Sequence, residues 1–189
     1  MGFRASDLER FRDETVPDLL PERLRLLFVG INPGLWTAAT GAHFARPGNR
    51  FYPALVAAGV LPHPPTITEE GMSPADRDLL VQRGIGVTNL VRRATARADE
   101  LSREELRAGA QALAALVADR RPPVVAVVGL TAYRQGFDRP RAVSGEQAEA
   151  LAGARLWVVP NPSGLNAHDT VDSLARAYAE PARAAGVIE

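Results

Sequence analysis

Cysteine and lysine are absent from this chain of 189 residues, and histidine occurs only three times. Without cysteine there can be no disulfide, no thiolate nucleophile and no cysteine-held zinc or iron–sulfur site. Without lysine there can be no lysine Schiff base and no phosphate-binding loop of the GxxxxGK[ST] kind. With only His43, His63 and His168, the sequence does not favour a multi-histidine metal site, so we expect neither a metal nor a cofactor.

The sequence also lacks an excess of charge of either sign. All 22 basic residues are arginine and are balanced by 22 acidic ones, so the formal net charge is zero and the pI is about 6.9. This balance argues against a protein that coats nucleic acid regardless of sequence, although it allows a local arginine patch.

Long apolar runs are missing as well. The N-terminal sequence lacks the apolar stretch of a signal peptide, and no run approaches the roughly 18 apolar residues of a transmembrane helix. We therefore expect a soluble, cytoplasmic protein with no membrane partner. The length and the 46% hydrophobic content fit one globular domain over residues 1–189, with residues 1–22 as a helical or extended appendage.

Short apolar runs alternate with segments of helical periodicity. The runs predict buried strands at residues 24–29, 85–88, 124–128 and 155–159. The helical spacing predicts helices at residues 50–58, at 74–82, from a Ser102–Glu105 capping box through Val117, and from Val171 to a stop at Gly186. This alternation is typical of an α/β fold, and we predict a three-layer α/β/α sandwich with a central, mainly parallel sheet. In such sheets the loops after the strands carry the function.

Two of the loops that follow predicted strands share a pattern. Residues 30–35 read GINPGL and residues 160–165 read PNPSGL. In each, an asparagine precedes a proline, which holds the asparagine backbone extended, and the following glycine is expected to adopt a positive φ. An Asn-Pro pair is also a common turn dipeptide, but two copies at equivalent strand ends favour amides held at the sheet edge for a function.

The loop at residues 41–52 is rich in aromatic and arginine residues. Aromatic rings there could form a floor on which a planar ring stacks, with an arginine nearby for phosphate. We favour this role for Phe44, which is isolated in the loop. For Phe51 and Tyr52, which open the next predicted helix, we favour a place in the core.

Four motifs stand in order along the chain: GINPGL at 30–35, GxHFAxPxNRF at 41–51, GVTNLV at 86–91 and NPSGL at 161–165. Together they resemble the mismatch-specific uracil-DNA glycosylases, family two of that superfamily and bacterial relatives of thymine-DNA glycosylase. The resemblance runs from residue 24 to residue 180, nearly the whole chain. It implies a base-excision-repair enzyme that flips uracil, or another mismatched or damaged pyrimidine, out of double-stranded DNA and hydrolyses its N-glycosidic bond.

The resemblance also assigns roles in a base pocket. Asn32 stands where the family holds its hydrolytic water, which an amide can only orient because it is not a useful base near neutral pH. Asn161 would lie across the pocket from Asn32. Phe44 matches the residue that stacks on the flipped base, Asn89 matches a base-edge asparagine, and backbone groups around Ile31 should contact the base.

The resemblance also implies that the second Asn-Pro motif contacts the DNA backbone and fills the gap that the flipped nucleotide leaves in the base stack. Ser163 could bind a phosphate, and Gly164, Leu165 and Asn166 match the wedge that replaces the flipped nucleotide. A core position for Leu165 is the alternative. This motif has no histidine at the place where the family-one uracil-DNA glycosylases carry one, so the resemblance implies that neutral donors stabilise the anionic base. Further phosphate contacts are expected from nearby arginines, of which the candidates are Arg46, Arg50, Arg92, Arg93 and Arg97.

The missing lysine bears on the reaction type. Without a lysine to form a Schiff base at the abasic sugar, we expect a monofunctional glycosylase without lyase activity. The N-terminal amine is the only obvious group that could form this Schiff base instead. We expect a monomer that is nucleoid-associated when it acts on DNA.

Two other classes of protein remain as alternatives: a non-catalytic module that binds DNA lesions or nucleotides, and a nucleic-acid amino-methyltransferase. The methyltransferase motif is Asn-Pro-Pro-aromatic, whereas this chain continues Ser-Gly and has no glycine-rich fingerprint after its first strand.

Overall fold

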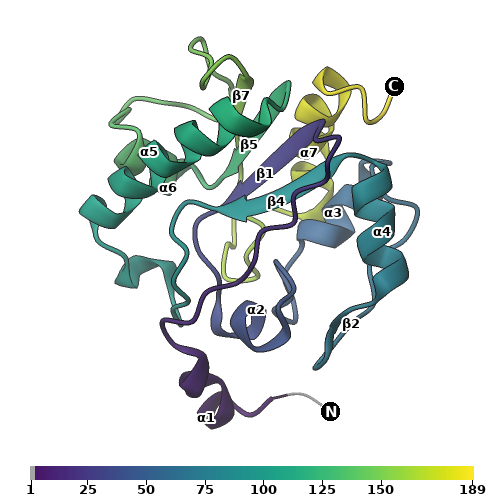
Figure 1. Cartoon of the computed structure of the whole chain (residues 1–189), viewed down its shortest axis with the longest axis vertical. Helices are drawn as coiled ribbons and strands as arrows, with labels where there is room; N and C mark the ends of the chain where they lie inside the picture. The colour runs from purple at the N-terminus through teal and green to yellow at the C-terminus, as the bar shows by residue number, and fades with distance from the viewer. Residues whose placement is uncertain (1–2) are drawn as a thin grey trace.

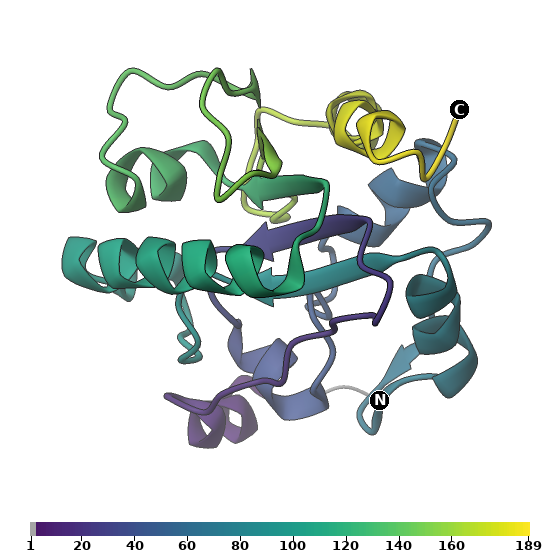
Figure 2. The same ribbon diagram turned by 45° about the horizontal axis from the view of Figure 1, so that its top comes forward.

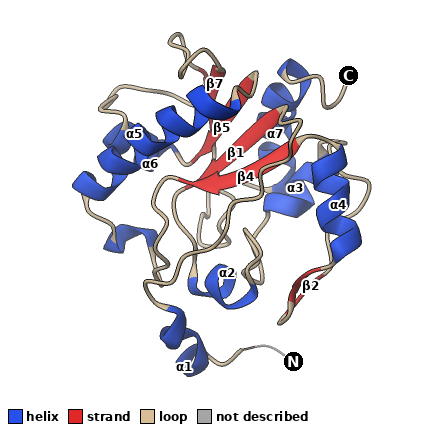
Figure 3. Ribbon diagram, viewed as in Figure 1, coloured by secondary structure: helices blue, strands red, loops and turns tan. Residues whose placement is uncertain are grey.

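A five-stranded sheet forms the centre of the computed structural model, which describes residues 3–189 (Figure 1, Figure 3). In spatial order the strands are β4 (Ile85–Asn89), β1 (Leu26–Gly30), β5 (Val124–Val128), β7 (Arg155–Val159) and β6 (Gly145–Glu146). The first four run parallel, and the two-residue β6 is antiparallel at the edge. All four predicted strands are therefore present, and the prediction of a mainly parallel sheet is confirmed.

Both faces of this sheet are buried, because successive side chains of a strand point to opposite sides. In β1, Phe28 belongs to the core cluster on one face, and Leu27 and Val29 belong to the cluster on the other. All five residues of β1 and all five of β5 are buried. The near-continuous apolar runs in the sequence are a direct consequence of this double burial.

Helices cover the two faces and complete the predicted three-layer sandwich (Figure 1). One face is covered by α3 (Phe51–Ala57), α4 (Pro74–Gln82) and α7 (Val171–Ala184), and the other by α5 (Arg103–Arg120) and α6 (Leu130–Gly136). The capping box predicted for α5 is present, with the Ser102 side chain accepting from the Glu105 N–H. Gly186 has a φ of 63° just after α7, as expected for a helix stop.

The shortest elements were not predicted. They are α1 (Ala5–Leu8), η1 (Glu9–Phe11), α2 (Leu35–Thr40), η2 (Ala98–Glu100), the α6 helix, the edge strand β6 and the β2–β3 hairpin (Ile67–Thr68 and Gly71–Met72). Each is too short to show a hydrophobic period, so tertiary contacts decide its conformation. Within residues 3–189 no helix has the length and hydropathy needed to cross a membrane.

The N-terminal segment joins the sheet before the first strand. Figure 2 shows α1 beside α2, away from the C-terminal helix α7. Further along, Leu19 and Val87 exchange backbone hydrogen bonds of 2.9 Å and 2.8 Å, which pairs residue 19 with the free edge of β4. Val16 and Leu19 are buried, and Leu19 contributes to the core cluster that includes α3 and α7.

A close approach between α5 and the end of β4 fixes the position of the loop that follows Asn89. A Cβ atom at Gly109, in the middle of α5, would lie only 2.2 Å from the Leu90 carbonyl oxygen. Only glycine fits at position 109, because any side chain would collide with the Leu90 backbone, although glycine is a weak helix former.

We predict that Gly109→Ala lowers the free energy of unfolding by about 1–3 kcal/mol, because the added methyl group overpacks against backbone. Helix propensity alone would give the opposite sign, a gain of about 1 kcal/mol. Urea unfolding measures the change. Ala108→Gly, at an exposed neighbouring position, is the control, and it should lose about 1 kcal/mol through propensity alone. A Gly109→Ala protein more stable than the unaltered chain would contradict the close contact.

Candidate active site

A cavity of about 150 Å³ lies at the carboxyl ends of the parallel strands. It is lined by residues from the loops after β1, β4 and β7, by the end of β5, and by the 41–49 loop. Seven of the residues predicted from the sequence line it together: Ile31, Asn32, Phe44, Arg46, Asn89, Asn161 and Ser163. Gly164, Leu165 and Asn166 lie outside this lining.

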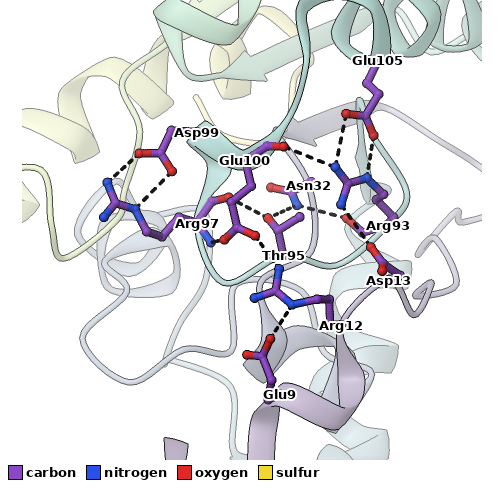
Figure 4. A network of polar contacts seen from close by, with 10 residues as sticks. All are labelled: Glu9, Arg12, Asp13, Asn32, Arg93, Thr95, Arg97, Asp99, Glu100 and Glu105. Atoms are coloured by element: carbon purple, nitrogen blue, oxygen red, sulfur yellow. Dashed lines mark hydrogen bonds and ion pairs between the residues drawn. The ribbon is translucent and has the colours of Figure 1, made fainter.

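The amide of Asn32 has a fixed direction. Its Nδ2 donates to the Arg93 carbonyl oxygen at 3.0 Å and to Thr95 Oγ1 at 2.7 Å (Figure 4). A carbonyl oxygen can only accept, so the NH₂ group must face it, and Asn32 Oδ1 must point the other way. Both N–H groups are thus used, and Oδ1 has no protein partner within the described part of the chain. The cavity therefore contains a preset hydrogen-bond acceptor.

Thr95 completes this arrangement, and no motif in the sequence points to it. Its hydroxyl donates to the Arg97 carbonyl oxygen at 2.7 Å, so its oxygen is left to accept from Asn32. Thr95 is 1% exposed, and its backbone N–H bonds to the Pro33 carbonyl oxygen. A threonine four positions after a motif carries no recognisable signal, because only the folded loop brings it to Asn32.

Phe44 forms one wall of the cavity. Its ring stacks on Phe51, with ring centroids 3.9 Å apart and an interplanar angle of 20°. Phe51 and Tyr52 are buried in the core, which confirms the interpretation preferred for them. Phe44 has a φ of 57°, an uncommon conformation for a bulky residue, and the surrounding packing must hold it there. The half-buried ring thus presents its remaining surface to the cavity.

Asn89 and His43 meet on another wall. The Asn89 side chain, at the end of β4, lies beside Gly30 in the register of the sheet. Its Nδ2 is 3.2 Å from Nδ1 of His43, which is buried. Burial lowers the pKa of His43, which favours the neutral imidazole. No role was predicted for His43 beyond its place in the 41–51 motif.

The second Asn-Pro loop forms a local turn. Asn161 Oδ1 accepts from the Ser163 N–H at 2.9 Å, and the Asn161 carbonyl oxygen accepts from Asn166 Nδ2 at 3.0 Å. The oxygens of Asn161 are thus engaged, while its Nδ2 has no protein partner among the described residues. The amide of Asn166 is engaged in the same turn.

The positive φ predicted for the glycines of both motifs is wrong. Gly34 is extended, with a φ of −77°, because it caps the N-terminus of α2. Gly164 does not have a positive φ either. Glycine is needed there for a different reason: a Cβ atom at Gly164 would lie 2.9 Å from the Gly48 carbonyl oxygen. Leu165, the next residue, is 73% exposed, so the alternative that it belongs to the core is wrong.

Arg50 joins the 41–52 loop to the 163–169 loop. Its guanidinium donates to the carbonyl oxygens of Ser163 at 2.5 Å, Asn166 at 2.7 Å and Asp169. Its Nε is buried without a partner in the part of the chain that the structure describes. The interpretation of Arg50 as a phosphate ligand is not supported, because its donors are used to hold the second loop in place.

The other candidate arginines differ in their ion pairs. Arg92 pairs with Asp18. Figure 4 shows that Arg97 pairs with Asp99, at 2.5 Å, and that Arg93 pairs with both Asp13 and Glu105. The hydrogen bonds from Arg93 lower the pKa of Glu105 to about 2. Arg46 lines the cavity and forms no ion pair with any residue in the range 3–189.

The chemistry available in the cavity follows from these groups. No carboxylate occurs among the described residues that line it, and no cluster of His, Asp or Glu suited to a metal is found in residues 3–189. The site can hold a planar ring against Phe44, offer amide groups to its edge, and orient a water molecule on Asn32 Oδ1. It can therefore promote a hydrolysis by positioning, without a general base of ordinary strength.

Comparison with known proteins gives the family and the fold of the chain. Residues 17–181 match the family model of the uracil DNA glycosylase superfamily. The fold is similar to the solution NMR structure of a protein from Methanosarcina acetivorans assigned as a candidate uracil DNA glycosylase, with a TM-score of 0.58 and 16% sequence identity. The match covers 89% of this chain and 96% of that one.

We predict that Arg50→Met lowers the free energy of unfolding by about 2 kcal/mol, because three carbonyl oxygens lose a charged donor. Amide hydrogen exchange should become faster within residues 163–169 and should change little in β1. Arg46→Met is the matched control, since Arg46 is an exposed arginine of the same loop, and its effect should stay below about 0.5 kcal/mol. Equal effects of the two substitutions would show that Arg50 does not hold the loop.

Proposed function

The chain belongs to the uracil DNA glycosylase superfamily, and we propose that within it this protein is a mismatch-specific uracil-DNA glycosylase of the thymine-DNA glycosylase branch. It flips uracil out of mismatched double-stranded DNA and hydrolyses the N-glycosidic bond as a step of base excision repair. The observation that carries the proposal is the preset acceptor, Asn32 Oδ1, in a cavity that has an aromatic wall at Phe44 and no carboxylate.

The hydrolytic step then depends on position. Asn32 Oδ1 orients a water molecule toward the sugar carbon, and Thr95 together with the Arg93 carbonyl oxygen keeps the amide from rotating. The glycosidic bond breaks through an oxocarbenium-like state while negative charge builds on the base. Because Asn32 cannot remove a proton, most of the rate must come from stabilising that departing base.

The pocket residues account for binding of the flipped base. The base stacks on Phe44, Asn89 and backbone groups near Ile31 contact its edge, and Asn161 Nδ2 can donate from the opposite wall. We expected only neutral hydrogen-bond donors to stabilise the anionic base. Arg46 adds a positive charge to these donors, because its guanidinium lines the cavity without an ion-pair partner among the described residues. A cation at this point favours the anionic base once DNA excludes water from the site.

The 163–166 loop is proposed to enter the duplex. Leu165 projects from a turn that Arg50 and Asn166 hold rigid, and its exposed side chain can fill the gap left by the flipped nucleotide. Ser163, beside it, is proposed to bind an adjacent phosphate. The protein would act as a cytoplasmic monomer on the nucleoid.

Absence of lysine makes the proposed enzyme monofunctional. No side chain of the sequence can form a Schiff base with the abasic sugar, which leaves the N-terminal amine as the one group that could, and we expect the DNA backbone to stay intact after base release.

The test is release of base from labelled duplexes containing U:G, T:G or U:A, and from single-stranded uracil, in single-turnover assays. We expect release from U:G without strand nicking until heat or alkali is applied. Asn32→Ala should slow release at least about a hundredfold, since the water loses its orienting acceptor, while duplex binding is retained.

Thr95→Val and Thr95→Ser refine the same test. Valine has the shape of threonine but no hydroxyl, so the Asn32 amide loses one hydrogen bond, and release should slow about tenfold. Serine keeps the hydroxyl and should stay close to the unaltered rate. Release by Asn32→Ala at the unaltered rate would refute this role for Asn32, and duplex binding with no release by the unaltered protein would support the non-catalytic alternative.

Leu165→Ala tests the wedge. We expect about tenfold weaker binding to abasic product DNA, because the inserted side chain no longer fills the gap, with little change in melting temperature. Val143→Ala is a matched control, since Val143 is 68% exposed on a different loop, and it should leave DNA binding unchanged. Equal binding by Leu165→Ala and the unaltered protein would remove Leu165 from the interface.

A further inference from the structure

His43 is held in one tautomer by the N-terminal segment. Its Nε2 lies 3.0 Å from the Pro17 carbonyl oxygen, which can only accept, so Nε2 must carry the proton. The ring is 6% exposed, and burial is the main cause that lowers its pKa below the ordinary value of 6.5. The imidazole is therefore neutral near pH 7, and its Nδ1 is a bare acceptor.

This tautomer determines the direction of the Asn89 amide. Nδ1 of His43 can accept but not donate, so the atom facing it at 3.2 Å must be the NH₂ group of Asn89. Asn89 Oδ1 then points away from His43 and lies beside Gly30. A Cβ atom at Gly30 would be 2.5 Å from this oxygen and 3.4 Å from Phe44 Cζ. Asn89 Oδ1 and the Phe44 ring therefore lie close together beside Gly30, and both residues line the cavity.

Two groups of Asn89 remain for a ligand: Oδ1 as an acceptor and the second N–H as a donor. A base stacked on Phe44 meets them side by side. Uracil and thymine present N3–H next to a carbonyl oxygen, which complements this pair, whereas cytosine presents a bare N3 next to an amino group. Cytosine would require the amide to be reversed. The reversed amide would place Oδ1 against the lone pair of His43 Nδ1.

We propose that His43, held by the Pro17 carbonyl oxygen, is a specificity-determining residue that makes the pocket select pyrimidines with an N3–H over cytosine. This proposal rests on the proposed function, because it assigns the flipped base to the same cavity. His43 acts through Asn89 and is a positioning residue. A second proton on His43 would convert Nδ1 into a donor, permit the reversed amide and weaken the selection.

The charged groups around His43 come from three elements. Asp18 in the N-terminal segment favours the protonated ring, and Arg77 in α4 disfavours it. From α3, the Tyr52 hydroxyl donates to the His43 carbonyl oxygen at 3.0 Å, and burial raises the pKa of Tyr52, so it stays neutral. Asp18 and Arg77 shift the His43 pKa in opposite directions, and burial, which lowers this pKa, is the largest effect. His43 therefore stays neutral at physiological pH and takes its second proton only in acid.

The experiment compares binding of two duplexes with non-cleavable 2′-fluoroarabino nucleotides, one carrying uracil and the other cytosine. Each faces an abasic-site analogue, so neither base loses a Watson–Crick pair when it is flipped. At about pH 7.5 the unaltered protein should bind the uracil duplex about tenfold more tightly. His43→Leu removes the acceptor and should reduce this ratio at least about threefold, because the amide becomes free to reverse.

A pH series adds a readout that a purely structural role of His43 would not change. In the unaltered protein the uracil-to-cytosine ratio should be constant near neutral pH and fall in acid, below the ordinary histidine pKa of about 6.5. In His43→Leu the ratio should not respond to pH over that range. Asn89→Ala is a control that should give a low ratio at every pH.

An unchanged ratio in His43→Leu overturns the proposal. If that variant does not fold, an Asn89→Ala protein that keeps the uracil-to-cytosine ratio of the unaltered protein overturns it instead, because His43 acts through Asn89. Failure of the proposed function gives a different result, because the unaltered protein would then release no uracil from a U:G duplex. A protein that releases uracil but shows no effect of His43 refutes this inference alone.

Discussion

Backbone groups that can only accept or only donate a hydrogen bond control the direction of every amide in the cavity. The Arg93 carbonyl oxygen orients Asn32, and the Pro17 carbonyl oxygen orients Asn89 through the tautomer of His43. The Ser163 N–H orients Asn161 in the same way. An amide has nearly the same shape in both orientations, so packing alone could not choose between them. The loops that supply these backbone groups are therefore as much a part of the site as the asparagines.

Hydrogen bonds and close backbone contacts fix the positions of those loops relative to one another. Arg50 satisfies three carbonyl oxygens of the 163–169 loop, and Gly164 touches the backbone of Gly48. Gly109 allows α5 to contact Leu90, directly after Asn89. Desolvating a guanidinium without a carboxylate partner costs free energy, and an orphaned Nε adds to it. This cost offsets part of the stabilisation that the three carbonyl contacts of Arg50 provide.

The sequence predicted the elements that depend on hydrophobic period and capping, and it did not predict the contacts made across the fold. The strands 124–128 and 155–159 and the helix 74–82 have the bounds expected for them, because each is a continuous pattern between turn residues. Local motifs also located Asn32, Phe44 and Asn89. Thr95 and His43 were not assigned their roles, because each acts on a residue more than forty positions away through a contact that only the folded chain creates. The φ of Gly34 was mispredicted for the same reason, since α2 was not foreseen.

The contact between Pro17 and His43 has a consequence for how this protein can vary. The contact uses only the backbone oxygen of residue 17, so many different side chains at that position could supply it equally well. A comparison of related sequences would therefore show no constraint on residue 17 itself. The constraint would appear in spacing instead, because an insertion or deletion between residue 17 and the bridge at Leu19 would move the oxygen away from His43. Natural selection could therefore act on the number of residues between position 17 and Leu19, rather than on the identity of residue 17.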